Sequence, residues 1–307
     1  MIFYSMPVIL KELAVMAPAK VNLHLAVKDK RPDRYHNLES VFLAVDWGDR
    51  LFFEIIDTGE NSVSEDKITM FRPEWAAEKE KISLNDNTIF RALSLFREKT
   101  GFLSKFKITA EKRIPIGGGL GGGSSDAAAA LLALNKIAGF PLDKNVLLEM
   151  GAAIGSDVPF FLHETAAAYV TGRGECIEPL KLPPMFLSLV NPGFPRNTAK
   201  AFGLLDKYRE SETKNEELEF NRTILNSSLI ISNSSFFNSF LPVFGGKEKS
   251  IYNEIISDLM ELGAEFAGLS GAGSTCFGIF HEWEQAIKAT EVLQEKWGFG
   301  QACKFLG

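Results

Sequence analysis

Short runs of apolar or alternating residues near the start of the chain predict β-strands. They cover residues 8–16, 21–27, 38–45 and 50–56, and Pro, Gly or Asp residues separate them. The next stretch, 57–81, is polar and irregular, so we expect a loop there. The first part of the chain is therefore predicted to be rich in strands.

Apolar residues at helical spacing predict three helices further along the chain, at 87–99, 125–138 and 142–154. Asn85 or Asp86 can serve as the N-cap of the first helix. An alternating strand that begins at Phe106 comes before the second helix, and a glycine-rich loop joins the two. The centre of the chain is thus expected to form a unit of strand, loop and helix.

The second half of the chain mixes strands and helices. Strands are expected at 166–170, 175–179, 186–190, 265–269, just before Phe280 and at 301–306, and helices at 250–262 and 283–297. The stretch 209–239 is polar and rich in Ser and Asn, and its pattern does not place its helices. This order of elements indicates an α+β sandwich, and we expect a domain boundary near residues 165–180.

Length, composition and charge narrow the class of protein. The 307 residues are enough for two domains, and 46% hydrophobic and 23% charged residues are ordinary for a soluble globular protein. A net charge of −6 argues against a nucleic-acid partner, and three scattered cysteines are too few for a disulfide framework. The N-terminus lacks a basic signal-peptide region, and no apolar run approaches the roughly 20 residues of a membrane span. We therefore expect a cytoplasmic protein.

One glycine tract carries the strongest functional signal. Six of the seven residues from Gly117 to Gly123 are glycine, and the alanine-rich helix follows directly. The backbone N–H groups of such a run can turn toward an anion, and the start of the helix adds unpaired N–H groups. A flexible linker is the alternative, but linkers do not usually lie between an alternating strand and a helix. We therefore predict a phosphate-binding loop.

Two other phosphate loops fit this tract less well. No Gly-Lys-Ser/Thr closes it, so it is not a Walker A loop. Gly117, Gly119 and Gly122 satisfy a dinucleotide-binding pattern, but so rich a tract satisfies almost any glycine pattern. A dinucleotide loop also follows an apolar strand directly, whereas here the strand is half-exposed and Pro115 interrupts. Dinucleotide binding is therefore the minor alternative.

Two further segments carry side chains suited to catalysis. Lys20 and Asn22 alternate on a predicted strand and share one face, where they could hold a hydroxyl and a phosphoryl group. They could equally form the solvated side of an edge strand. Asp157 lies between a Gly-Ser turn and an apolar run, and it either caps a helix or turn or accepts a proton from an alcohol in a cleft.

Two more segments have less specific chemistry. Tyr35 and His36 combine an aromatic platform with a ring that donates or accepts near neutral pH. On residue chemistry alone, a solvent-exposed loop is the favoured interpretation of this pair. The second glycine loop, at 270–274, is either another anion nest or a tight turn between strands.

Five segments together resemble the GHMP kinases, the galacto-, homoserine, mevalonate and phosphomevalonate kinases. Pro115-Ile-Gly-Gly-Gly-Leu-Gly-Gly-Gly-Ser-Ser125 resembles their phosphate loop. Three segments resemble motifs of the branch that acts on a cytidine-diphosphate polyol, namely Pro18-Ala-Lys-Val-Asn22, Arg34-Tyr-His36 and Gly155-Ser-Asp-Val-Pro-Phe-Phe161. Leu269-Ser-Gly-Ala-Gly-Ser274 resembles the C-terminal glycine motif. All five occur in the expected order.

The resemblance implies a two-domain α+β GHMP kinase fold. The N-terminal, ATP-binding domain over 1–168 would be like ribosomal protein S5 domain 2, and the C-terminal, substrate-binding domain over 169–307 would be a ferredoxin-like α/β sandwich. The implied reaction transfers phosphate from ATP, with Mg²⁺, to the 2-hydroxyl of CDP-methylerythritol in non-mevalonate isoprenoid biosynthesis. A mevalonate-type or homoserine kinase and a non-catalytic ligand sensor are the alternatives. We expect no nucleic-acid or membrane partner, and a monomer or a homodimer.

The resemblance also assigns catalytic and acceptor-side residues. Asp157 falls on the catalytic aspartate, which takes the hydroxyl proton. Lys20 falls on the partner lysine, which orients that aspartate and offsets charge. Asn22 matches a residue that positions the methylerythritol, and Thr198 lies on the substrate side.

Nucleotide-binding residues follow from the same resemblance. Tyr35 and His36 match a pair that stacks on cytosine and hydrogen-bonds its edge, and Phe202 matches a second stacking aromatic. The implied ATP-binding residues are Pro115, Gly117, Gly118, Gly119, Leu120, Gly121, Gly122, Gly123, Ser124, Ser125 and, on the adenine side, Asn87.

Two positions depart from the family pattern. Asp126 stands where asparagine is common, just inside the helix, where its charge either complements the helix N-terminus or disfavours phosphate. The region 205–250 matches poorly, and Asn238-Ser-Phe-Leu241 only loosely resembles an Asn-Asp-x-Glu element. The resemblance therefore says little about the helices of that region.

Overall fold

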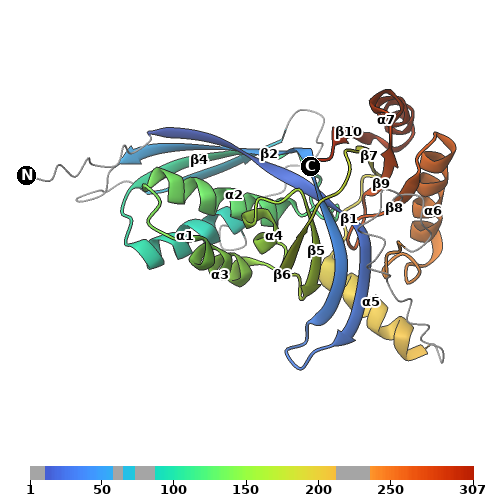
Figure 1. The fold of residues 1–307 in the computed structure, drawn as a ribbon, viewed down its shortest axis with the longest axis horizontal. Helices are drawn as coiled ribbons and strands as arrows, with labels where there is room; N and C mark the ends of the chain where they lie inside the picture. The colour runs from blue at the N-terminus through green and yellow to red at the C-terminus, as the bar shows by residue number, and fades with distance from the viewer. Residues whose placement is uncertain (1–10, 58–64, 73–86, 212–235) are drawn as a thin grey trace, which may run out of the picture. The chain divides into compact units, whose positions relative to one another are not determined.

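The structure of the chain is a computed structural model that describes residues 11–57, 65–72, 87–211 and 236–307 (Figure 1). The chain forms two compact units, and each takes its residues from several stretches. The first unit comprises Met1–Pro18, Gly48–Arg113 and Gly122–Glu164, and the second comprises Ala19–Trp47, Ile114–Gly121 and Thr165–Gly307. The division of the chain at residue 168 stays a prediction.

The first unit is a sheet with helices against one face (Figure 1). One end of each of two long strands, β1 (Glu12–Lys30) and β2 (His36–Asp57), belongs to it. β2 pairs antiparallel with β4 (Lys105–Glu111), and β3 (Lys67–Phe71) pairs parallel with β4. The helices are α1 (Thr88–Thr100), α2 (Gly122–Ile137), α3 (Lys144–Ile154) and α4 (Val158–Leu162). Every second residue of β4 is buried, as one covered face requires.

The second unit contains a four-stranded antiparallel sheet in the order β10-β7-β9-β8. Its strands are β7 (Phe186–Asn191), β8 (Phe266–Leu269), β9 (Cys276–Phe280) and β10 (Phe299–Lys304). The helices of this unit are α5 (Thr198–Ser211), α6 (Gly246–Glu261) and α7 (Trp283–Trp297). The other end of β2 pairs with β5 (Ala167–Gly172), which pairs with β6 (Cys176–Leu180).

Both faces of the four-stranded sheet are buried. Phe277 and Ile279 of β9 join a core with Val21 and Leu23 of β1, whereas Cys276 of β9 joins the core formed with the helices α5, α6 and α7. Alternate residues of one strand thus enter opposite cores, because successive side chains point to opposite faces. Burial on both faces explains why the sequence of β9 is a continuous apolar run.

Near the start of the chain the strand predictions were correct in position but wrong in length, and residues 8–10 of the first one lie outside the described residues. Four short strands were expected there, and the described residues form two long ones, β1 and β2. Pro18 does not break β1, because β1 pairs only with β2 among the described strands and so has an edge that needs no N–H donor. Gly48 does not break β2 either. A Cβ atom there would lie 2.0 Å from the carbonyl oxygen of Ala17, so glycine permits close approach of β1 and β2.

Other local predictions were also wrong. β3 lies within the segment that was expected to be a loop, and α4 and α5 were not expected. Asn85 and Asp86 lie outside the described residues, and Asn87 is the N-cap of α1, because its side-chain oxygen accepts a hydrogen bond from the N–H of Ile89 at 2.9 Å. Helix α2 begins at Gly122, three residues before the predicted start, whereas α7 has the predicted limits.

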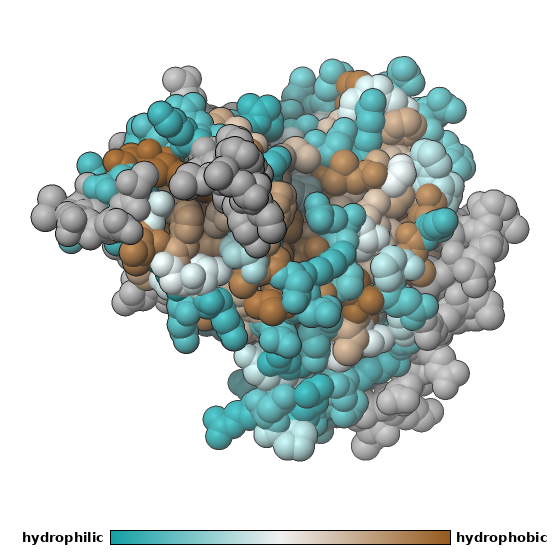
Figure 2. Space-filling view, turned by 60° about the vertical axis from the view of Figure 1, so that its left-hand side comes forward, coloured by the Kyte–Doolittle hydropathy of each residue, from teal (hydrophilic) through white to brown (hydrophobic). Residues whose placement is uncertain are grey.

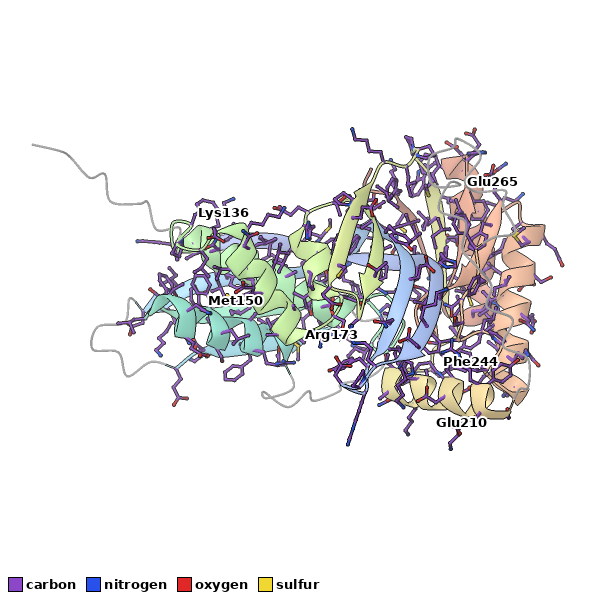
Figure 3. The ribbon with its side chains drawn as sticks, turned by 60° about the horizontal axis from the view of Figure 1, so that its bottom comes forward. Lys136, Met150, Arg173, Glu210, Phe244 and Glu265 are labelled. Atoms are coloured by element: carbon purple, nitrogen blue, oxygen red, sulfur yellow. The ribbon has the colours of Figure 1, made fainter. Side chains whose placement is uncertain are left out.

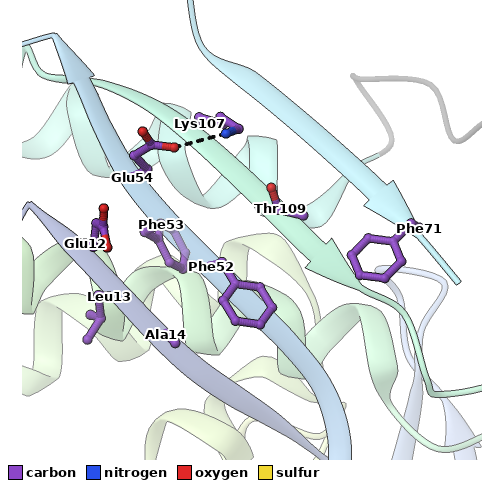
Figure 4. Close-up of a pocket in the computed structure, with 9 residues that line it drawn as sticks. All are labelled: Glu12, Leu13, Ala14, Phe52, Phe53, Glu54, Phe71, Lys107 and Thr109. Atoms are coloured by element: carbon purple, nitrogen blue, oxygen red, sulfur yellow. Dashed lines mark hydrogen bonds and ion pairs between the residues drawn. The ribbon is translucent and has the colours of Figure 1, made fainter. Parts of the chain in front are cut away.

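A cavity of the first unit lies apart from the predicted site residues. Hydrophobic and hydrophilic residues are interspersed on the face in Figure 2. A cavity of about 470 Å³ lies on the sheet of the first unit, lined by residues 12–14, residues 52–54, Phe71, Lys107 and Thr109 (Figure 4). None of the residues predicted to carry function lines it. Within the described ranges, no helix has both the length and the apolar character that crossing a membrane requires.

Candidate active site

Lys20 and Asn22 lie on one face of β1 in the second unit and are in direct contact. The ammonium of Lys20 donates a hydrogen bond to Oδ1 of Asn22 at 2.6 Å and lies 4.5 Å from the centre of the Phe42 ring. Lys20 is 4% exposed and Asn22 is 3% exposed. The alternative of a solvated strand face is therefore wrong. Burying an ammonium costs free energy, which its hydrogen bond to Asn22 and the face of Phe42 help to offset. A lysine held in this way, next to the glycine loops, is a candidate for chemistry.

A chain of hydrogen bonds fixes Asn22 in place. Its Nδ2 donates to the hydroxyl of Ser40 at 3.0 Å, and its backbone N–H donates to the hydroxyl of Ser270 at 3.3 Å. The hydroxyl of Ser270 in turn donates to the carbonyl of Gly119 at 2.9 Å. Asn22 is thereby tied to both glycine loops, and the loop residue Leu120 accepts a hydrogen bond from the backbone N–H of Lys20 at 3.0 Å.

The two glycine loops of the second unit meet backbone to backbone. Gly119 has a φ of +77°, and a Cβ atom on it would lie 2.1 Å from the carbonyl oxygen of Ser270. The N–H of Thr275 donates to the carbonyl of Gly118 at 3.1 Å. The second loop closes on itself, since Ser270 donates its N–H to the carbonyl of Thr275 at 2.9 Å, so it is a tight turn between β8 and β9. Its use as an anion nest stays a prediction.

Asn191 and Asn238 hold the second loop from two sides. Asn191, at the end of β7, donates to the hydroxyls of Ser274 at 3.1 Å and Thr275 at 2.9 Å. Asn238 donates to the carbonyls of Leu269 at 2.7 Å and Gly271 at 2.8 Å. The poorly matching region thus supplies one residue that braces the loop.

An aromatic cluster surrounds His36 at the start of β2. The rings of His36 and Phe202 are stacked, with centres 5.0 Å apart and planes at 17°. Phe202 also meets the ring of Phe240 edge-on at 5.0 Å. Nε2 of His36 lies 2.7 Å from Oδ1 of Asp206. The expectation of an exposed loop is therefore wrong for His36, which is 6% exposed.

Tyr35 presents the exposed part of this cluster. Its side chain is 52% exposed, and the guanidinium of Arg173 lies 4.9 Å from the centre of its ring. Arg173 belongs to the turn between β5 and β6 (Figure 3). Thr198, the first residue of α5, is also exposed. An exposed aromatic ring beside a cation is suited to stacking against a planar, electron-rich ligand.

Asp157 lies in the first unit, at the residue before α4. Its carboxylate does not cap that helix, so the capping interpretation is wrong. The turn in front of α4 is formed by the backbone, through a hydrogen bond from the N–H of Val158 to the carbonyl of Gly155 at 3.2 Å. The side chains of α4 are buried, whereas Asp157 is half-buried. The carboxylate of Asp157 thus stands directly before a buried apolar helix without a capping hydrogen bond to it.

The start of α2, also in the first unit, has an unusual buried hydroxyl. Ser125 is 1% exposed, and its Oγ has no hydrogen-bond partner among the described residues. The hydroxyl of Thr88 donates to the carbonyl of Gly123 at 2.7 Å, which ties α1 to this turn. Asn87 is buried, and its amide is engaged at both ends, by the cap of α1 and by a contact of 3.7 Å with Sδ of Met70.

Asp126 faces the interior rather than the phosphate loop. The ammonium of Lys112 contacts the carboxylates of both Asp126 and Asp49, and all three residues are buried. Burial, and then the nearby charge of Asp49, raise the pKa of Asp126 to about 7 against the influence of Lys112. Although burial acts to lower it, the two carboxylates raise the pKa of Lys112 above its ordinary value. The contact closes the segment between 112 and 126, which contains the glycine tract.

Comparison with known proteins connects this geometry to a family. Residues 87–165 match the GHMP kinases N-terminal domain, and residues 228–298 match the GHMP kinases C-terminal domain. A 4-diphosphocytidyl-2-C-methyl-D-erythritol kinase of Thermodesulfovibrio yellowstonii is 35% identical over 292 residues, which cover 93% of this chain and 95% of that protein. The chain belongs to the 4-diphosphocytidyl-2-C-methyl-D-erythritol kinase family. The prediction of a GHMP kinase is therefore confirmed.

Further relatives give the same family and fold. A 4-diphosphocytidyl-2-C-methyl-D-erythritol kinase of Xylella fastidiosa is 35% identical over 277 residues, covering 90% of this chain and 84% of that protein. A crystal structure of 4-(cytidine 5'-diphospho)-2C-methyl-D-erythritol kinase is 31% identical, with a TM-score of 0.73, and the match covers 95% of this chain and 98% of the other. A Leishmania major mevalonate kinase, 15% identical with a TM-score of 0.66 over 98% of both chains, shares the two-domain GHMP kinase fold.

The candidate site of this member of the 4-diphosphocytidyl-2-C-methyl-D-erythritol kinase family includes residues that the sequence did not reveal. Within the second unit, the structure brings Lys20 and Asn22 to the glycine loops, and His36 to Phe202. Ser40, Ser270 and Asp206 complete these two groups and were not predicted. Ser270 was visible only as part of a glycine loop. Asp206 follows Phe202 by four residues, which is the spacing of one helix face, but no helix was expected there.

Proposed function

We propose that this chain transfers the γ-phosphoryl group of ATP to the 2-hydroxyl of 4-diphosphocytidyl-2-C-methyl-D-erythritol. Family membership supports the reaction. The choice of substrate rests on the group of Tyr35, His36 and Phe202. The exposed ring of Tyr35 can stack on a pyrimidine base, and the polar ring of His36 can hydrogen-bond its edge. The reaction is phosphoryl transfer, in which a protein contributes mainly position and electrostatics.

In this proposal the segment from Pro115 to Ser125 grips the ATP phosphates. The glycines leave its backbone N–H groups accessible to an anion, and the turn at 270–275 holds Gly118 and Gly119 in shape. Asn87 lies on the adenine side. A backbone braced in this way limits the reorganisation that nucleotide binding requires, which favours catalysis.

Mg²⁺ would accompany the ATP. Among the described residues, no group of three or more His, Cys, Asp or Glu side chains could hold a metal ion. Mg²⁺ needs no such group, because it is usually held by nucleotide phosphates, water and one or two protein groups. The buried and unpartnered hydroxyl of Ser125 is a suitable oxygen donor. When bound, Mg²⁺ neutralises charge on the phosphates.

The acceptor side uses four residues. Asp157 takes the proton of the 2-hydroxyl, as general base. Lys20 supplies positive charge to the reacting oxygens, and Asn22, fixed by Ser40 and Ser270, positions the methylerythritol, with Thr198 on the same substrate. The buried ammonium of Lys20 is suited to this function because the low local dielectric strengthens its field.

We expect the reaction to take place in the cytoplasm, a compartment in which free thiols stay reduced. We expect the chain to act as a monomer or a homodimer, without nucleic-acid or membrane partners.

A substrate competition tests the proposal. The protein is offered ATP with 4-diphosphocytidyl-2-C-methyl-D-erythritol, mevalonate or homoserine, and ADP release is measured. We expect turnover with the first substrate alone. Preference for mevalonate or homoserine would contradict the substrate, and no ADP release with any of them would favour a ligand sensor.

Asp157→Asn tests the general base. The kcat should fall by about 10²–10⁴-fold, because the amide cannot accept the hydroxyl proton. Asp143→Asn is the matched control, since Asp143 caps α3 and asparagine caps a helix equally well. A folded Asp157→Asn protein with nearly unchanged kcat would show that Asp157 is not the base.

A further inference from the structure

Asp206 is a residue of the second unit that the reaction outlined above leaves without a function. Its carboxylate binds Nε2 of His36 through Oδ1 at 2.7 Å and the ammonium of Lys30 through Oδ2 at 2.6 Å. Although partial burial acts to raise it, hydrogen bonds from Lys30 and His36 hold the pKa of Asp206 below its usual value. The carboxylate is therefore ionised at neutral pH, and it can only accept hydrogen bonds.

Helix α5 fixes the His36 ring with two residues of one face. Phe202 and Asp206 are four positions apart on this helix, so their side chains lie one turn from each other. Phe202 stacks on the plane of the imidazole, and Asp206 binds its edge. The first contact sets the plane of the ring, and the second sets its rotation within that plane. Arg209 anchors the helix to β1 by donating to the carbonyl of Lys28 at 2.8 Å.

The contact with Asp206 also determines where the neutral imidazole carries its proton. Because an ionised carboxylate can only accept, Nε2 must donate, and Nδ1 is then a bare acceptor. Among the described residues, no hydrogen bond of a protein group to Nδ1 of His36 is present. A ring held in this way presents one unused acceptor at a defined angle.

We propose that Asp206 is a positioning residue that sets the tautomer of His36 and thereby makes the nucleotide site select a base with an exocyclic amino group. Cytosine offers such a donor at its 4-position, whereas uracil offers a carbonyl oxygen there. The acceptor Nδ1 can take a hydrogen bond from the amino group of cytosine. It cannot form one with the carbonyl oxygen of uracil, since both atoms are acceptors. This inference rests on the proposed function, in which a cytidine diphosphate substrate binds at His36.

Base discrimination in the Asp206→Asn variant tests the inference. The kcat/KM is measured at pH 8 for the cytidine diphosphate substrate and for its uridine diphosphate analogue. Asparagine can either accept from or donate to Nε2, so both tautomers of His36 become available. The ratio of the two kcat/KM values should fall by about tenfold, the order expected for one matched hydrogen bond. Most of this change should be in KM, with kcat at saturating cytidine substrate within about twofold.

Two further variants and one spectroscopic measurement make the test specific. Asp29→Asn removes an exposed carboxylate that binds Asn37 on the same pair of strands, and it should leave the ratio unchanged. Phe202→Leu should weaken both nucleotides alike, because stacking does not distinguish the two bases. ¹⁵N chemical shifts of His36, assigned with His36→Gln, should show the Nε2–H tautomer in the wild type and a mixture in Asp206→Asn.

Several outcomes would overturn the inference. An unchanged ratio in folded Asp206→Asn would do so, as would Nδ1–H as the main tautomer of the wild type. A wild type that uses both nucleotides equally would refute the selection by the base while the proposed kinase reaction stands. If neither nucleotide is phosphorylated, the proposed function fails and the inference fails with it.

Discussion

Gly119→Ala tests how the two glycine loops are joined. The new Cβ atom would lie 2.1 Å from the carbonyl oxygen of Ser270, where ordinary contact begins at 3.4 Å. The obstacle is backbone, so no side chain can rotate away. The loops must therefore separate by about 1 Å, which follows from the excluded contact of a carbon and an oxygen atom.

The cost follows from the contacts that this separation breaks. Three hydrogen bonds depend on the present spacing: Ser270 Oγ to Gly119 O at 2.9 Å, Thr275 N to Gly118 O at 3.1 Å and Asn22 N to Ser270 Oγ at 3.3 Å. Each contributes about 1 kcal/mol to the free energy of unfolding. The left-handed backbone of Gly119 adds about 1–2 kcal/mol when the residue is alanine. We expect a total loss of about 4–5 kcal/mol, a large part of a typical domain stability.

Thermal melting of a second glycine variant separates the steric clash at Gly119 from the cost of its left-handed backbone. At about 2 °C per kcal/mol, Gly119→Ala should lower the melting temperature by about 8–10 °C, and it should also lower kcat/KM for ATP. Gly193→Ala is the control, because Gly193 has a similar φ of +83° and nothing within 4 Å of the added atom. Its expected loss is about 2–4 °C. Equal losses in the two variants would refute the steric argument.

Three shorter predictions concern single side chains. Burial raises the pKa of Asp126 to about 7, whereas an unfolded aspartate titrates near 4, so its stabilising contribution is complete below about pH 4 and is lost as the pH rises to 7. The free energy of unfolding of Asp126→Asn minus that of the wild type, both measured in urea, should therefore increase from pH 4 to pH 7. A difference that stays constant over this range would contradict the prediction. Lys20→Met should lower kcat by about 10²-fold or more. Its melting temperature should stay within a few degrees of the wild type, because methionine also packs against Phe42. A loss of folded protein that parallels the loss of kcat would show that Lys20 has a structural function instead. Phe202→Leu should raise KM for the cytidine substrate by about tenfold with little change in kcat, and unchanged KM would exclude stacking at this residue.

The sequence predicted the parts of the fold that depend on local periodicity. The limits of α7 and the alternation of β4 follow from patterns within single segments. The length of β1 and β2 could not be predicted, because Pro18 and Gly48 resemble breaks until the pairing of the strands is known. Such pairing is a tertiary property, and it overrides local preference.

The candidate site could be predicted from the sequence where its residues lie together in one short motif. Lys20, Asn22 and the glycine tract carry signals that lie within a few positions of one another. The burial of His36 could not be inferred in this way, because its partner Asp206 is 170 positions away and sits on an unexpected helix. The pKa of Asp126 likewise depends on Asp49 and Lys112, which only the fold brings to it.

The contact of the two glycine loops also limits how this enzyme can be modified. Gly119 and Ser270 meet through backbone atoms, and a change of side chain on one loop cannot compensate for a change on the other. A phosphate loop transplanted from a distant kinase would therefore have to bring its own counterpart of residues 270–275. Gly119 and Ser270 are 151 positions apart in the sequence, yet their two loops must be exchanged together in protein engineering.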